Sequence, residues 1–163
     1  MAKARTVVSL SAQLILLAVI AAAFFMRTSH VDGLSMEPRV HTGEFVLINT
    51  LAYRFGQIRR GDVVAFRHES PTPETYIKRV VALPGERVAV TGGVVTIDGR
   101  TLPEPYVQFP DRRSAPAVTV PPGAVYVLGD NRADSDDSRN FGVVRDSELV
   151  GKALVGIWPP RRI

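Results

Sequence analysis

The feature that most constrains the fold of this chain is an uncharged stretch near its N-terminus. Residues 6–26 are 21 consecutive residues without a charge, preceded by Lys3 and Arg5 and followed by Arg27. As a helix rising about 1.5 Å per residue, this stretch would span about 30 Å, the thickness of the hydrocarbon core of a bilayer. We therefore expect a transmembrane helix over residues 6–26, after a short basic N-terminus over residues 1–5.

The same stretch fits a second interpretation, a cleavable secretory signal. A basic start and an apolar middle are followed by three alanines at 21–23, which match the small residues before a signal cleavage site. Arg27 and Arg39 nearly balance the basic residues on the N-terminal side, so the positive-inside rule barely decides the topology. Both interpretations address the protein to a membrane. N-terminal sequencing of the mature protein would separate them, because cleavage would leave Phe24 as the first residue.

After residue 27 the sequence is typical of an all-β domain. The chain has 163 residues, enough for one domain with a core, and its 13 Gly and 12 Pro favour short strands over long helices. Residues 102–122 carry many prolines and are expected to be extended or looped. Strands are predicted from short apolar runs between turn residues, at 44–48, 62–66, 76–83, 87–90, 94–98, 124–128 and 149–158.

Charge and cysteine content exclude several classes of protein. Cysteine is absent, so no disulfide or thiolate–metal framework can form. The formal net charge of +4 suits an anionic partner. Arginine pairs such as Arg59-Arg60 and Arg112-Arg113 are isolated rather than part of a basic stripe, so we expect a lipid bilayer rather than nucleic acid as the partner.

Two residues suited to hydrolysis stand in this β-rich part. Ser35 opens the run Ser-Met-Glu-Pro, and Lys78 lies in a strand-like run at 76–81. A serine hydroxyl becomes a useful nucleophile when a base takes its proton, and a lysine kept neutral by desolvation can be that base. In a strand, Tyr76 and Val80 share the face of Lys78 and give it aromatic and apolar neighbours. The alternatives are a turn serine and a solvent-exposed lysine on an edge strand.

A cluster of polar residues follows the predicted strand at 124–128. Residues 129–139 read Gly-Asp-Asn-Arg-Ala-Asp-Ser-Asp-Asp-Ser-Arg, which suggests a loop whose polar groups satisfy one another and whose hydroxyls could hold a lysine amine. A solvated acidic turn is the alternative. A calcium loop counted from Asp134 fails, because Arg139 stands where glycine is needed and Arg145 where glutamate is needed. We expect no metal.

Four runs occur in a fixed order along the chain. Ser35-Met36-x-Pro38 is followed by Arg-Gly-Asp-Val-Val at 60–64, by Tyr-Ile-Lys-Arg-Val-Val-x-x-Pro-Gly-Glu at 76–86, and by the cluster at 129–139. Ser35 and Lys78 are 43 residues apart, and Lys78 and Ser135 are 57 apart. This ordered set resembles that of the bacterial type I signal peptidases, the Ser/Lys serine peptidases of family S26. The similarity covers nearly the whole chain after the apolar stretch.

The resemblance implies a fold and a set of catalytic roles. The fold would be mainly β, an antiparallel, barrel-like catalytic domain over 27–163 with a small β subdomain around 86–122. Ser35 would be the nucleophile and Lys78 the general base. The backbone N–H of Ser35 would stabilise the oxyanion, and no metal or cofactor would be needed. Catalytic support would come from one loop, with Ser135 orienting the Lys78 amine and with Asp137 and Arg139 holding the loop.

The resemblance also implies the substrate and the location. Family members cut secretory preproteins after small residues at the −1 and −3 positions, on the extracytoplasmic side of the cytoplasmic membrane, and here a single-pass anchor would hold the enzyme there. The substrate would bind as an extended strand alongside residues 31–33. Ordinary core packing is the alternative role for the five residues that match the substrate pockets: Val31, Met36, Val40, Tyr76 and Ile77.

The chain departs from the family at two places near the nucleophile. Gly33 stands where some members place a serine hydroxyl in the oxyanion hole, as in relatives that lack it, so the hole would rest on backbone donors. Arg39-Val40 replaces the usual Thr-Leu, which brings a large, charged side chain next to the local substrate contacts. Elsewhere, Leu51, Tyr53 and Phe55 alternate like one face of a strand. We expect them, with Trp158, to pack in the core, and insertion into the headgroup layer of a membrane is the alternative.

Two other classes of protein remain as rivals. A self-cleaving repressor with Ser/Lys chemistry predicts a DNA-binding helical domain before the serine, where this chain has an apolar stretch. A membrane-anchored β-domain that only binds partners predicts an exposed Lys78 far from Ser35.

Overall fold

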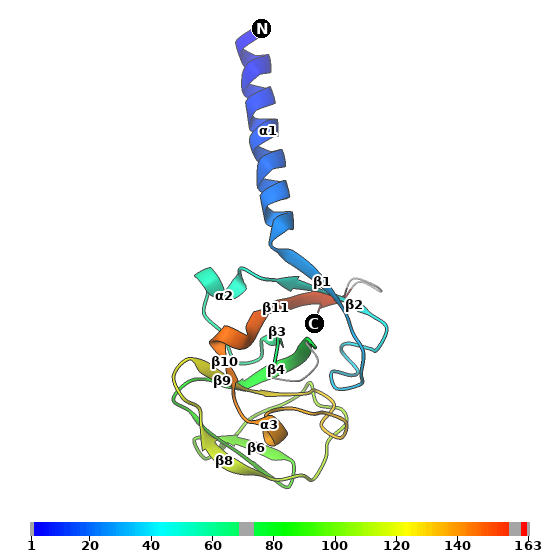
Figure 1. Ribbon diagram of the computed structural model, residues 1–163, viewed down its shortest axis with the longest axis vertical. Helices are drawn as coiled ribbons and strands as arrows, with labels where there is room; N and C mark the ends of the chain where they lie inside the picture. Colours follow the sequence, from blue (N-terminus) through cyan, green and yellow to red (C-terminus); the bar gives the residue numbers. More distant parts are fainter. Residues whose placement is uncertain (1, 69–73, 157–160, 163) are drawn as a thin grey trace.

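In the computed structural model the chain forms a long N-terminal helix followed by a β domain (Figure 1). The structure describes residues 2–68, 74–156 and 161–162. The helical segments are α1 (Ala2–Phe24), α2 (Ala52–Phe55), α3 (Ser138–Phe141) and the 3-10 turn η1 (Asp146–Glu148). The strands are β1 (Met26–His30), β2 (Phe45–Asn49), β3 (Val63–Phe66), β4 (Tyr76–Ala82), β5 (Arg87–Thr91), β6 (Val94–Ile97), β7 (Arg100–Thr101), β8 (Ala115–Thr119), β9 (Ala124–Leu128), β10 (Val144–Arg145), β11 (Leu149–Gly156) and β12 (Arg161–Arg162).

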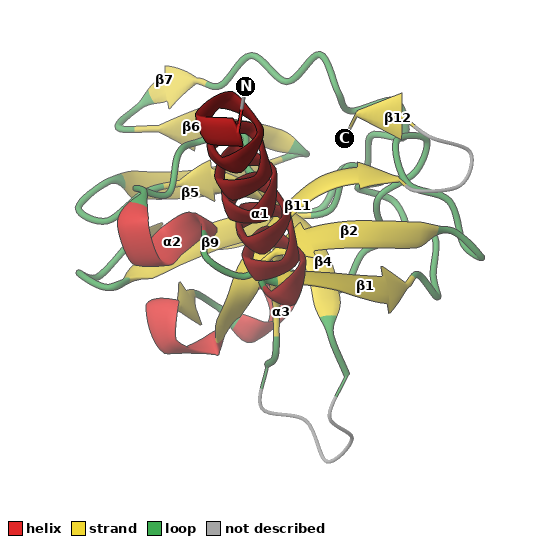
Figure 2. Ribbon diagram, turned by 90° about the horizontal axis from the view of Figure 1, so that it is seen from above, coloured by secondary structure: helices red, strands yellow, loops and turns green. Residues whose placement is uncertain are grey.

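Helix α1 stands away from the β domain and leads directly into β1 (Figure 1). Seen from above, α1 lies in front of the strands (Figure 2). Its 23 residues are mostly apolar and include many alanines and leucines, both strong helix formers. The helix ends at Phe24, earlier than predicted, because Met26 already pairs with Asn49 on β2. Within the described residues, no helix is both long enough and apolar enough to cross a membrane.

The larger sheet has the strand order β1-β2-β11-β3-β4-β9-β10, with β12 added to β11. Every neighbouring pair in it is antiparallel, which confirms the predicted mainly β, antiparallel fold. The expected barrel-like closure is wrong for the described strands. Closure requires the two end strands to pair, whereas β1 pairs only with β2, and the two-residue β10 pairs only with β9.

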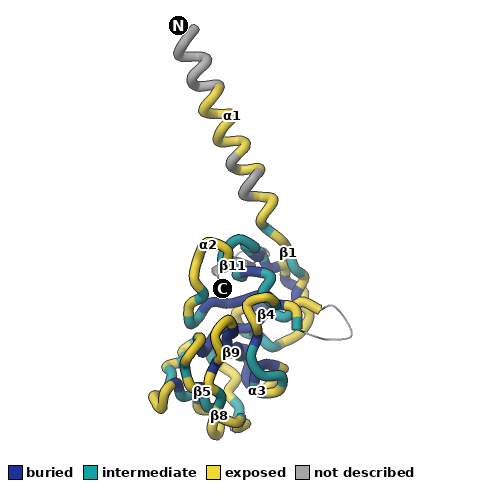
Figure 3. Tube along the Cα trace, turned by 60° about the vertical axis from the view of Figure 1, so that its left-hand side comes forward, coloured by how far each residue is buried: buried dark blue, intermediate teal, exposed yellow. Residues whose placement is uncertain are grey.

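The central strands of this sheet are buried on both faces. Strand β3 is buried throughout. Strand β9 is also buried throughout, and β4 is buried from Ile77 onward (Figure 3). Alternate residues of β3 enter two different apolar clusters: Val63 packs with Val31 and Met36, whereas Val64 packs with residues of β9. Two-sided burial explains why these strands read as continuous apolar runs rather than as an alternating pattern.

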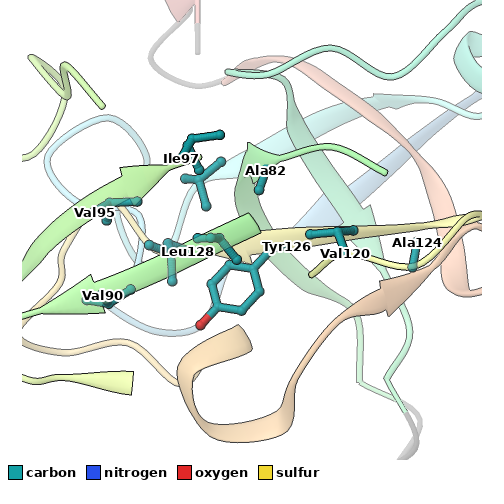
Figure 4. Packing of buried hydrophobic residues seen from close by; sticks show 10 residues of the cluster. Ala82, Val90, Val95, Ile97, Val120, Ala124, Tyr126 and Leu128 are labelled. Atoms are coloured by element: carbon teal, nitrogen blue, oxygen red, sulfur yellow. The ribbon is translucent and has the colours of Figure 1, made fainter. Parts of the chain in front are cut away.

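Residues 87–119 form a second, four-stranded sheet with the order β7-β6-β5-β8. The turn between β5 and β6 consists of Gly92 and Gly93, both with positive φ, as a tight hairpin turn requires. Val90 and Val95 of this sheet pack against Tyr126 and Leu128 of β9, so the two sheets share one core (Figure 4).

Two local features differ from the sequence expectation. Residues 52–55 form α2 rather than an alternating strand, so that Tyr53 packs against the core while Phe55 is 88% exposed. The expectation of core packing is therefore wrong for Phe55. Strand β8 arises inside the proline-rich stretch and includes Pro116, which an edge strand paired only with β5 tolerates. Trp158 lies outside the described residues.

Candidate active site

A small cavity lies between the segment that follows β1 and the start of β4. Its volume is about 90 Å³, the space of roughly three water molecules. Residues 30–33, 35 and 36 form one wall, and residues 74–78 form the other. Ser35 reaches this wall because β1 ends at His30 and the chain then makes a turn, in which Glu37 N–H donates to Leu34 O.

Ser35 and Lys78 meet in this cavity. Lys78 Nζ lies 2.7 Å from Ser35 Oγ, within hydrogen-bonding distance. Strand β4 lies between β3 and β9 in the interior of the sheet, and Lys78 is only 4% exposed. The alternative of a solvent-exposed lysine on an edge strand is therefore wrong. Tyr76, on the same face of β4, has its ring centroid 5.7 Å from Nζ.

Burial changes the acidity of Lys78. Desolvation lowers its pKa from 10.5 to about 8, because a buried ammonium loses its hydration. The negative charges of Asp137 and Asp136 act in the opposite direction but are outweighed. With this pKa, about a tenth of the amines are neutral at pH 7 and able to accept a proton.

Asp137 is held by partners other than Lys78. Arg139 Nε and Nη2 each lie 2.8 Å from one carboxylate oxygen, and Gly129 N–H donates to Oδ2 at 3.0 Å. Burial alone would raise the pKa of Asp137, but the hydrogen bonds and charge of Arg139, with the Gly129 N–H, leave it below its usual value. Arg139 thus keeps Asp137 ionised, and Asp137 still raises the pKa of Lys78 against the larger opposite effect of burial.

Ser135 is buried in the same loop, and its hydroxyl donates to Asp137 Oδ2 at 2.7 Å. The orientation of the Lys78 amine by Ser135 stays a prediction. Gly129 separates Ser135 from the nucleophile segment. A methyl group at Gly129 would lie 2.2 Å from Ser135 Oγ and 2.6 Å from the carbonyl oxygen of Ser35. Only glycine allows this close approach.

Asn131 joins the polar loop to the nucleophile segment, a role that sequence reasoning did not assign. Its backbone N–H donates to Ser35 O at 3.0 Å, and its side-chain Nδ2 donates to Leu34 O at 3.2 Å. These two bonds fix the peptide groups next to Ser35. The sequence placed Asn131 in the polar cluster, but its partners are nearly a hundred residues away and have no local signal.

Arg79 and Asp130 form a buried ion pair on the other face of β4. Arg79 Nε and Nη2 lie 2.7 and 2.6 Å from the two oxygens of Asp130, which is fully buried. Arg79 also donates to Gly61 O at 2.7 Å and lies 4.4 Å from the ring centroid of Tyr106. The pair ties β4, which carries Lys78, to the start of the loop that carries Ser135.

The proline-rich segment between β7 and β8 also supports the site. Glu104 binds Arg132 through both carboxylate oxygens, and Asp111 accepts a hydrogen bond from Arg139 Nη1 at 2.7 Å. The sequence predicted an extended or looped segment here and assigned it no catalytic part. Glu104 and Asp111 are visible in the sequence as acidic residues. Their arginine partners could not be predicted, because those contacts depend on how the segment folds back onto the loop at 129–139.

The predicted substrate-pocket residues separate into two groups. Val31, Met36, Tyr76 and Ile77 line the cavity that contains Ser35 and Lys78. Val40 is fully buried in the apolar cluster behind it, where it packs with Val31 and Met36. The structure therefore brings four of the five residues to the cavity. Val31, Met36 and Ile77 also belong to the same buried apolar cluster as Val40, so their role as substrate pockets stays a prediction.

Comparison with known proteins points to one class, a peptidase. Residues 4–158 match the family model described as "Signal peptidase, peptidase S26". A signal peptidase I of Bacillus caldolyticus is 36% identical over 143 residues, covering 79% of this chain and 78% of the relative. Signal peptidase IB of Staphylococcus aureus is 29% identical over 172 residues, covering 94% of this chain and 88% of the relative.

A solved structure gives the same result. The crystal structure of a signal peptidase I from Enterococcus faecalis superposes with a TM-score of 0.51 at 32% identity, covering 59% of this chain and 96% of that chain. The chain therefore belongs to the signal peptidases of peptidase family S26, and its relatives place it among the bacterial type I enzymes, which are serine endopeptidases.

Proposed function

We propose that this enzyme removes N-terminal signal peptides from secretory preproteins, with Ser35 as the nucleophile and Lys78 as the general base. The observation that carries the proposal is the 2.7 Å separation of Lys78 Nζ and Ser35 Oγ, in a cavity where Lys78 is 4% exposed. The names of the relatives support the same substrate class. A partner-binding β domain without chemistry gives no reason to bury a lysine against a serine hydroxyl.

The reaction begins when Ser35 Oγ attacks the carbonyl carbon of the scissile bond. The hydroxyl proton passes to neutral Lys78 Nζ, and the resulting ammonium gives it to the leaving amine. Water then attacks the acyl-enzyme and loses a proton to Nζ, which passes that proton to Ser35 Oγ as the ester bond breaks. The product is released as the free carboxylate, and Ser35 and neutral Lys78 are restored. Ser35 N–H donates to no other described residue, so it is available to the oxyanion.

The loop 129–139 positions this pair. Arg139 binds Asp137, and Asp137 in turn accepts hydrogen bonds from Gly129 and Ser135. We propose that Ser135 orients the Lys78 amine when a substrate covers the cavity, exchanging its bond to Asp137 for one to Nζ. Asp137 and Arg139 act as positioning residues because both contact the loop rather than the reacting atoms.

The shape of the cavity supports a preference for small side chains at the −1 and −3 positions. A volume of about 90 Å³ accepts a methyl group, and the walls of Val31, Met36 and Ile77 are buried and apolar. Tyr76 lines the same space, and Val40 packs behind Val31 and Met36. Residues 31–33 follow the sheet's edge strand, so an extended substrate can add there as a further strand.

We further propose that residues 6–26 anchor the enzyme in the cytoplasmic membrane as a single pass. Residues 1–5 would then lie in the cytoplasm and the domain at 27–163 on the extracytoplasmic side. Support comes from the uncharged sequence and from the exposure of Leu14, Ile15 and Leu17 on α1, between 62% and 67%. Among the described residues, no side chain of α1 belongs to an apolar cluster of the β domain.

The function is tested by incubating the detergent-solubilised full chain with a secretory preprotein and determining product masses by mass spectrometry. We expect one cut, directly after the signal peptide and following small residues at −1 and −3. The Ser35→Ala variant should give no cleavage while keeping the thermal unfolding midpoint of the wild type. Cleavage by Ser35→Ala, or cuts scattered through the mature region, would refute the proposal.

The rate of cleavage should rise with pH through a single ionisation near pH 8. Lys78 is active as the neutral amine, and burial lowers its pKa to about 8, so activity is lost below this pH and gained above it. The inflection of the kcat/KM profile reports the pKa of Lys78 in the free enzyme. The kcat profile reports its pKa in the enzyme–substrate complex and should inflect at lower pH, because bound substrate excludes more water from Nζ. A kcat/KM profile that is flat from pH 6 to 9, or rises only near pH 10.5, would contradict the assignment.

A further inference from the structure

A second and larger cavity lies at the end of the β domain from which α1 extends. Its volume is about 490 Å³, and it shares no lining residue with the cavity that contains Ser35. Its walls come from the beginning of β1, from α2, from the end of β3 and from the start of β11. Figure 1 shows α2 and the C-terminal end of α1 at this same end of the β domain.

Three arginines line this cavity, each from a different element. Arg27 belongs to β1, Arg54 to α2, and Arg67 follows β3. All three are exposed, and none forms a side-chain hydrogen bond or ion pair with another described residue. By contrast, Arg79 and Arg139 are each paired with a carboxylate.

The charge of this cavity is positive and largely unbalanced. Asp146 is the one carboxylate among its lining residues, so the arginines outnumber carboxylates three to one. The fold holds three like charges around one hollow, which costs free energy unless an anion lies between them. Guanidinium groups bind phosphate oxygens with two parallel hydrogen bonds, which makes phosphate the anion best matched to this lining.

The surroundings favour a phosphate attached to lipid. Phe25 lines the cavity, and the neighbouring Phe24 and Phe55 are 84% and 88% exposed. Exposed aromatic side chains beside arginines are typical of residues at a membrane interface, where the ring enters the acyl region and the cation meets the headgroup. A soluble phosphate compound would gain nothing from these rings.

We propose that Arg27, Arg54 and Arg67 bind the phosphate of an anionic phospholipid headgroup, with Phe55 inserted beside its acyl chains. This inference rests on the proposed anchoring of α1, which brings the cavity to the surface of the bilayer. The headgroup gives the domain a second attachment beside α1 itself. Two attachments restrict rotation about α1 and hold the Ser35 cavity in one orientation toward membrane-bound preproteins.

The test measures binding of short-chain dioctanoyl phosphatidylglycerol to the full chain in a nonionic detergent, by native mass spectrometry and calorimetry. Replacing all three arginines, by Arg27→Gln, Arg54→Gln and Arg67→Gln, should weaken this binding by about tenfold or more. A matched variant with Arg87→Gln, Arg100→Gln and Arg112→Gln removes the same charge from three exposed, unpaired arginines of the described small-sheet region and should bind like the wild type. Dioctanoyl phosphatidylcholine should bind weakly to every form.

Four outcomes would overturn the proposal. Equal losses in the two triple variants would show a general charge effect rather than a site. Binding of glycerol 3-phosphate as tight as that of the lipid would assign the cavity to a soluble anion. Cleavage lost by the first variant in lipid-free detergent, with an unchanged unfolding midpoint, would assign the cavity to the preprotein. Binding that persists in the first variant would exclude the three arginines. A wild type that binds the lipid but cleaves no preprotein refutes the proposed function instead, and leaves this site standing.

Discussion

Replacing Lys78 by arginine should lower kcat for preprotein cleavage by about 10²–10⁴-fold, the usual contribution of a general base. Arginine keeps a positive charge of similar reach, so a purely structural or charge-balancing role for Lys78 would survive the change. A role as general base would not survive it, because guanidinium remains protonated at every pH at which the protein is folded and cannot accept the proton of Ser35. The measurement is single-turnover cleavage of a preprotein at pH 9, where most of the wild-type amine is neutral.

The matched control for this variant is Lys152→Arg. Lys152 lies on β11, is partly exposed and forms an ion pair with Asp62, which arginine can preserve. The same chemical change there should leave kcat within about twofold of the wild type, because no proton transfer depends on it. Cleavage by Lys78→Arg at a rate near that of Lys152→Arg would remove Lys78 from the reaction and with it the proposed mechanism.

The place of Lys78 shows how much the sequence could predict. Alternation along a strand put Lys78 on one face with Tyr76, and the continuous apolar run predicted a buried strand. Both features are present in the structure. The contact with Ser35 spans 43 residues and follows from no local pattern. It was predicted only because four separate runs resemble one family in order and spacing.

The residues that sequence reasoning missed share a physical cause. Asn131, Glu104 and Asp111 act through partners brought close by the folding of the loop and the small sheet. A polar residue in a loop carries no sign of which distant carbonyl or guanidinium it will meet. The error at Phe55 has a different origin. Three alternating apolar residues fit one face of a short strand, but a single helical turn turns Phe55 out to solvent while Tyr53 stays packed.

The open sheet likewise depends on tertiary context. Alternation and turn residues predict which segments become strands, but closure into a barrel depends on whether the first and last strands are long enough and close enough to pair. Here β1 leaves its outer edge without a strand among the described residues. That same edge is where an extended substrate would be added, so the failure of the barrel prediction and the proposed substrate site have one structural basis.

The buried pair of Arg79 and Asp130 links stability to the geometry of the site. Both oxygens of Asp130 are bound by Arg79, so removing the carboxylate leaves a buried guanidinium whose remaining described hydrogen-bond acceptor is Gly61 O. An unpaired charge in a protein interior loses its hydration without compensation. The same pair holds β4 against the loop at 129–139, so the loss should also loosen the position of Lys78 relative to Ser35.

The Asp130→Ala variant should lose about 3–5 kcal/mol of unfolding free energy, measured by urea denaturation of the full chain in detergent. Asp134→Ala, an exposed carboxylate four residues later in the same loop, is the matched control and should unfold like the wild type. Replacing both partners, by Arg79→Met with Asp130→Leu, should cost less than Asp130→Ala alone, because no charge is then left buried. If the double variant is instead the least stable of the three, the pair contributes direct attraction beyond the removal of an unpaired charge, and the explanation by desolvation is wrong.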